Sequence, residues 1–142
     1  MLTDTPITPS RSAEVENAVE ELYAALRAGD VRRVAAVLSE DDGSMVFGTD
    51  GHECWSGPVA AEQNFRIQLE ATGGFDLFDL APVAYQHGGV GWFSDRPSLR
   101  LPDGTEVPCR LSGVFVREAG AWRMHQSHFS VGADVNARLF PT

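Results

Sequence analysis

The sequence has few cysteines, few basic residues and no long hydrophobic run. No apolar stretch approaches the roughly 18–20 residues that a helix needs to cross a bilayer, so a helical membrane protein is excluded. The 11 basic residues, all of them arginine, stand against 20 acidic ones, and the net charge of −9 repels phosphate backbones on average. We therefore expect a soluble protein whose partners include neither a membrane nor a nucleic acid.

The cysteines and histidines do not have the spacing of a disulfide framework or of a metal site. Cys54 and Cys109 form no CxxC motif, and we expect two unpaired thiols, although a disulfide between them stays open. His125 and His128 are three positions apart on an expected strand, so their side chains point to opposite faces, and no third ligand is near. The sequence therefore predicts neither a metal nor another cofactor.

The N-terminal segment lacks the basic end and the apolar run of a secretory signal. Its two prolines and its Thr and Ser content predict a flexible leader at residues 1–11. A chain of 142 residues is long enough for one compact domain with a core, and we expect that domain at residues 12–142. We expect a cytoplasmic location.

The periodicity of the chain changes from helical to extended. Apolar residues recur at the spacing of one helix face from residue 12 to 28, from 31 to 38 and from 58 to 72, and a short strand is expected at residues 45–47. After Gly74 the sequence predicts four extended segments joined by short hairpin turns. They span residues 75–86, 90–101, 106–117 and 122–131. This order predicts an α+β domain with helices on one face of an antiparallel sheet.

Four segments carry a resemblance to a known family. They are LYAALRAGDVRRVAAVL, FGTDGHECWSGPVAAEQNF, GGVGWFS and GVFVREAGAWRMHQSHFS. In this order they resemble the SnoaL-like branch of the nuclear transport factor 2-like superfamily, over nearly all of the chain after residue 12. The resemblance implies a cone-shaped cystatin-like fold, in which N-terminal helices pack on a curved antiparallel sheet, a pocket opens in the mouth of the cone, and two copies form a homodimer.

The family does not determine the function, because this fold hosts cyclases, isomerases, epoxide hydrolases, dehydratases, carriers and structural adaptors. Enzymes of the superfamily typically use an interior Asp or Glu for proton transfer. Here the last two strands have no acid between Glu106 and Glu118, which argues against polyketide-cyclase and ketosteroid-isomerase chemistry. We expect a protein that binds a small apolar, cyclic molecule and leave open whether it also catalyses cofactor-independent proton transfer. The alternative is a non-catalytic dimeric interaction or carrier domain.

The last hairpin is the first candidate for a site, because polar groups in a strand that faces a core are costly unless they pair or line a cavity. A tight turn at residues 119–120 pairs Phe115 with Met124 and directs Phe115, Gln126 and His128 to the interior face. His128 then serves as a base or donor in the pocket, or as a structural core histidine. A β-bulge would exchange the two faces beyond it.

The second candidate is Glu53. With Asp50 it forms either a general-acid pair or a stabilised turn, since its surroundings are rich in glycine. Tyr23, Trp55 and Trp92 supply flat apolar walls for a ligand with rings, or belong to the core. The opposite sheet face, with Val114, Val116 and Phe129 among mixed polar residues, is expected to be covered in the homodimer.

Overall fold

The computed structural model describes residues 4–132 and 139. Three helices stand in this part of the chain: α1 (Ala13–Ala28), α2 (Val31–Val37) and α3 (Pro58–Thr72). The strands are β1 (Ser10–Arg11), β2 (Met45–Phe47), β3 (Cys54–Ser56), β4 (Asp76–Phe78), β5 (Val83–His87), β6 (Val90–Asp95), β7 (Ser98–Arg100), β8 (Glu106–Glu118) and β9 (Ala121–Val131). No helix of the described residues is long and apolar enough to cross a membrane.

The helices begin and end at the capping residues that the sequence supplies. The Ser12 hydroxyl accepts a hydrogen bond from the Val15 N–H at the start of α1, and Asp30 caps α2 through the Arg33 N–H. Gly29 ends α1 in the left-handed region, at a φ of 67°. The three predicted helices are confirmed to within a residue or two.

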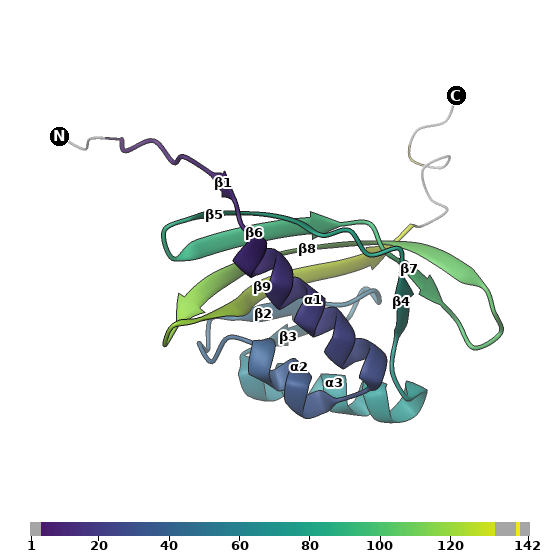
Figure 1. Cartoon of the computed structure of the whole chain (residues 1–142). Coiled ribbons are helices and arrows are strands. Elements are labelled where there is room, and N and C mark those ends of the chain that lie inside the picture. The colour runs from purple at the N-terminus through teal and green to yellow at the C-terminus, as the bar shows by residue number, and fades with distance from the viewer. Residues whose placement is uncertain (1–3, 133–138, 140–142) are drawn as a thin grey trace.

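One curved sheet has the strand order β1-β5-β6-β8-β9-β2-β3, and β7 joins it by pairing with β8 and β4. Figure 1 shows the long strands β8 and β9 arching over α1, with α2 and α3 beneath. The strand pairs are antiparallel as expected, except that β2 lies parallel to β9, so the sheet is mixed. Ser10 and Arg11, expected in the leader, instead pair with β5.

The core fills the space between the concave face of the sheet and the helices. Val15, Val19 and Tyr23 of α1 are buried against this face, where Phe93 and Phe115 pack edge to face with ring centroids 5.7 Å apart. Part of this core, including Leu22, Leu26 and Met124, also lines a cavity.

A β-bulge in the last hairpin decides which side chains of β9 face inward. Phe115 pairs with Met124, as predicted, but Val114 pairs with Gln126, so His125 is the extra residue. Gly113 lies against this bulge, where a Cβ at position 113 would collide with the Gln126 carbonyl. Beyond the bulge, the residues of β9 that were expected to face inward therefore face outward, and their neighbours face inward.

Candidate functional site: an apolar cavity with one carboxylate

A cavity of about 580 Å³ opens between α3, the β2–β3 hairpin and the inner face of the sheet. Its walls are mainly apolar and include five aromatic residues, Phe47, Trp55, Phe65, Phe75 and Phe129. The mouth lies beside α3, since the cavity-lining residues Ile67, Ala71 and Thr72 are exposed. A cavity of this size and lining is typical of a small-molecule site, for which about 300–1,000 Å³ is usual.

Glu53 supplies the charged group of this lining. The turn before β3 holds it in place, because the Asp50 N–H donates to Glu53 Oε1 over 3.0 Å and the Glu53 N–H donates to the Asp50 carbonyl, also over 3.0 Å. Gly48 lies directly against the Glu53 side chain, so a Cβ at this position would displace the carboxylate. Asp50 is therefore a turn residue rather than a second acid in the cavity.

Gln68 of α3 completes the arrangement. Its Nε2 donates to Glu53 Oε2 over 2.7 Å, so both carboxylate oxygens accept a hydrogen bond from the protein. Each oxygen keeps a lone pair for a further donor. Since Glu53 and Gln68 are half-buried, the carboxylate is oriented at the rim of an apolar cavity and stays within reach of a bound molecule.

Two of the seven predicted site residues line the cavity, Glu53 and Trp55. Trp55 packs edge to face with Phe65, at 5.6 Å between ring centroids, and forms one wall. Tyr23 and Phe115 do not reach the cavity, which corrects their expected place on its wall. Both are fully buried in the core that α1 forms with the concave face of the sheet.

Trp92, Gln126 and His128 lie on the outer face of the sheet, and their expected orientation toward the pocket is wrong. Trp92 alternates with the buried Gly91 and Phe93, and it stacks on Tyr85 with ring centroids 6.5 Å apart. Gln126 and His128 are exposed because the bulge turns them outward. His128 lies beside the Phe47 ring, over a polar hollow that Arg110 and Ser112 also line.

The sequence interpretation missed Gln68 and Ser127. Ser127 is buried and lines the floor of the cavity, where its hydroxyl can donate or accept. Its place follows from the bulge, which a single sequence does not position. Gln68 follows Phe65 by three residues on α3, so the helical spacing could have placed it on the cavity side.

The interpretation also missed the buried pair of Tyr23 and Asp95. The Tyr23 hydroxyl donates to Asp95 Oδ2 over 2.7 Å, and the Ala81 and Arg96 N–H groups donate to the same carboxylate. Burial, and then the hydrogen bond to Asp95, raise the pKa of Tyr23 far above its ordinary value. This pair ties α1 to β6 and lies outside the cavity lining.

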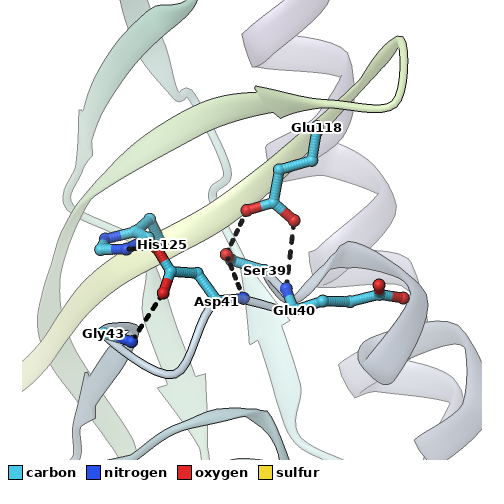
Figure 2. Close-up of polar contacts among 6 residues, drawn as sticks. All are labelled: Ser39, Glu40, Asp41, Gly43, Glu118 and His125. Atoms are coloured by element: carbon cyan, nitrogen blue, oxygen red, sulfur yellow. Dashed lines mark hydrogen bonds and ion pairs between the residues drawn. The ribbon is translucent and has the colours of Figure 1, made fainter.

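A second polar cluster ties the tip of the β8–β9 hairpin to the segment after α2 (Figure 2). Glu118 accepts hydrogen bonds from the buried Ser39 hydroxyl and from the Glu40 N–H. The bulged His125 places its Nε2 3.4 Å from Asp41 Oδ2. The Gly43 N–H and, next, His125 lower the pKa of the Asp41 carboxyl. These contacts are structural, since the cluster lies away from the cavity.

No group of three or more His, Cys, Asp or Glu side chains in the part of the chain that the structure describes is arranged to hold a metal ion. Cys54 and Cys109 are both free thiols, one exposed and one buried. Burial raises the pKa of the Cys109 thiol. Neither cysteine lines the cavity, whose described lining has Glu53 as its charged residue.

Comparison with solved structures identifies the fold. A nuclear transport factor 2-like protein of unknown function from Pseudomonas putida has a TM-score of 0.76 at 18% identity, over 90% of this chain and 94% of that chain. A candidate calcium/calmodulin-dependent protein kinase type II association domain from Thiobacillus denitrificans has a TM-score of 0.73 at 24% identity, over 91% and 100%. A candidate dehydratase of the same superfamily from Streptomyces avermitilis has a TM-score of 0.67 at 16% identity, over 84% and 95%.

No curated protein matches the sequence. The SnoaL-like domain family matches residues 15–134, which is most of the chain and contains every element from β2 to β9. The chain belongs to the SnoaL-like domain family and has the cystatin-like α+β fold of the nuclear transport factor 2-like structures that it resembles.

Proposed function

We propose that this protein binds a small, largely apolar molecule with rings in the cavity between α3 and the sheet. The observation that carries the proposal is the combination of an open cavity of about 580 Å³, aromatic walls and one oriented carboxylate at the rim. Buried apolar area supplies most of the affinity in such sites, and a few polar groups determine orientation.

An interaction domain with a vestigial pocket is the alternative from another class. Such a domain has no need of an open cone, and large side chains would be expected to fill it. Here the aromatic side chains form the walls of the cavity and leave its interior open. The open cavity therefore favours binding of a small molecule.

Glu53 is the group that we assign to proton transfer, if the bound molecule reacts. A carboxylate at the edge of an apolar cavity can accept a proton from an acidic C–H or O–H group of a ligand. Gln68 and the Asp50 N–H hold the carboxylate in one orientation, which is what a general base requires. His128 is not assigned this role because it lies on the outer face.

Binding is tested with Nile red, a neutral apolar dye whose fluorescence rises in an apolar site. Ala71→Trp places a large ring at the mouth of the cavity without disturbing the core, because Ala71 is exposed and lines the mouth. Gln63→Trp is the control, since Gln63 is exposed on the same helix and does not line the cavity. Native mass spectrometry of the purified protein then identifies any co-purified molecule.

We expect saturable binding of the dye to the unsubstituted protein, at least about tenfold weaker binding to Ala71→Trp, and affinity within about twofold for Gln63→Trp. Absence of saturable binding to the unsubstituted protein would overturn the proposal. Equal affinity of the two tryptophan variants would also contradict it, because the dye would then bind elsewhere.

A further inference from the structure

We infer that the cavity selects its ligand by the charge of the polar group: it takes neutral or cationic molecules that carry a hydrogen-bond donor on an apolar ring body, and rejects carboxylates and phosphates. This inference rests on the proposed function and concerns the same cavity. It names the substrate class, which the shape of the cavity does not.

The charge of the lining carries the argument. Among the residues that the structure describes, Glu53 is the charged residue of the cavity lining, and this described lining contains no arginine or histidine. The chain has no lysine at all. An anion in this cavity would lose its water shell and gain no cation in return, and that exchange is costly in an apolar site.

Arg66 and Arg100 lie on α3 and β7, two elements that also line the cavity, and they do not offset this charge because carboxylates already pair with them. Arg66 of α3 is 3.1 Å from Glu62, one turn away on the same helix. Arg100 is 3.3 Å from Asp76 and 3.4 Å from Glu106, and its guanidinium lies over the Phe78 ring. Neither arginine lines the cavity.

The geometry at Glu53 favours a donor on the ligand. The carboxylate oxygens already accept from Gln68 Nε2 and from the Asp50 N–H, and their remaining lone pairs can accept only from a donor. A hydroxyl meets this need with one hydrogen bond, and an ammonium group adds charge attraction. Because Glu53 is half-buried, solvent screens this attraction only in part.

Three naphthalene ligands that differ only in the polar group test the inference. They are 2-naphthylmethylamine, 2-naphthalenemethanol and 2-naphthoic acid, which are cationic, neutral and anionic near pH 7. Binding to the unsubstituted protein, to Glu53→Gln and to Glu70→Gln is measured by isothermal titration calorimetry. Glu70→Gln is the matched control, because it removes the same charge at an exposed position of α3 outside the cavity.

We expect the amine to bind at least about tenfold more tightly than the acid, with the alcohol between them. In Glu53→Gln this ratio should fall to within about threefold, whereas Glu70→Gln should keep it. Both variants have the same net charge, one unit less negative than the −9 of the unsubstituted protein, and differ only in where the charge is removed. Thermal melts check that Glu53→Gln remains folded. If it does not fold, the comparison of the three ligands on the unsubstituted protein still tests the inference.

The outcomes separate the two proposals. If all three ligands bind and the acid binds as tightly as the amine, the inference is overturned and the proposed function stands. If the ratio is the same in Glu53→Gln as in Glu70→Gln, the inference is likewise overturned, because overall charge then explains the preference. If none of the three binds, the proposed function itself fails.

Discussion

Replacing Tyr23 by Phe tests the buried pair that joins α1 to β6. Tyr23 is 1% exposed and its hydroxyl donates to Asp95, which is 8% exposed. The substitution removes one oxygen and opens no large cavity, so its cost is the lost hydrogen bond. A buried hydrogen bond to a charged group is worth about 1.5–3 kcal/mol. Asp95 keeps the Ala81 and Arg96 donors, and we therefore expect the lower end of this range.

The free energy of unfolding from urea titration measures the loss, and the melting temperature should fall by about 3–8 °C. Tyr85→Phe is the control, because Tyr85 is 36% exposed on the outer face. Its loss should stay within about 0.5 kcal/mol. A loss below about 0.5 kcal/mol for Tyr23→Phe would refute the reasoning, because the Tyr23–Asp95 bond would then contribute nothing measurable.

The same variant has a pH signature. The raised pKa of Tyr23 keeps its phenol neutral in the folded protein at a pH where the unfolded chain, with a tyrosine pKa near 10, already ionises. The stability that the Tyr23–Asp95 hydrogen bond contributes is therefore fully present below about pH 10 and is lost as the pH rises above that value. The stability gap between the unsubstituted protein and Tyr23→Phe should narrow above that pH, and a gap that stays constant to pH 11 would contradict this assignment.

Four further outcomes are expected. Gly113→Ala should lower the free energy of unfolding, measured by urea titration, by about 1–3 kcal/mol, because the added Cβ meets the Gln126 carbonyl at the bulge. Gly51→Ala is the control, since a Cβ at Gly51 meets nothing within 4 Å, and it should change the free energy of unfolding by less than about 0.5 kcal/mol. His128→Ala should leave both the melting temperature and the ligand affinity unchanged within error. A melting temperature lower by several degrees would show that the His128 side chain stabilises the fold. Light scattering at micromolar concentration should give about twice the 15.4 kDa chain mass, because the exposed Val83, Tyr85 and Val90 lie together on the outer face and need a cover. A molecular mass equal to that of one chain would contradict the proposed homodimer. Dialysis against a chelator should not lower the melting temperature, and a loss that zinc restores would reveal a metal requirement.

The local elements follow from the sequence because their signals are local. Ser12, Gly29 and Asp30 mark helix ends through contacts within a few residues, and the turn at residues 119–120 pairs Phe115 with Met124 as expected. The turn before Glu53 is also local, which is why the sequence could bring Glu53 and Trp55 forward as candidates. The parallel pairing of β2 with β9 joins residues about 80 positions apart, and no local sequence pattern predicts this pairing.

The sequence by itself determined the helices, the long final hairpin, the family and one acid of the site. The tertiary structure decided which face of each strand meets the cavity. Because side chains alternate along a strand, one extra residue at His125 reverses the orientation of the β9 residues from Gln126 to Val131. That single insertion turns His128 outward and Ser127 inward, so the cavity is apolar with Glu53 as its charged group rather than a pocket built around a histidine.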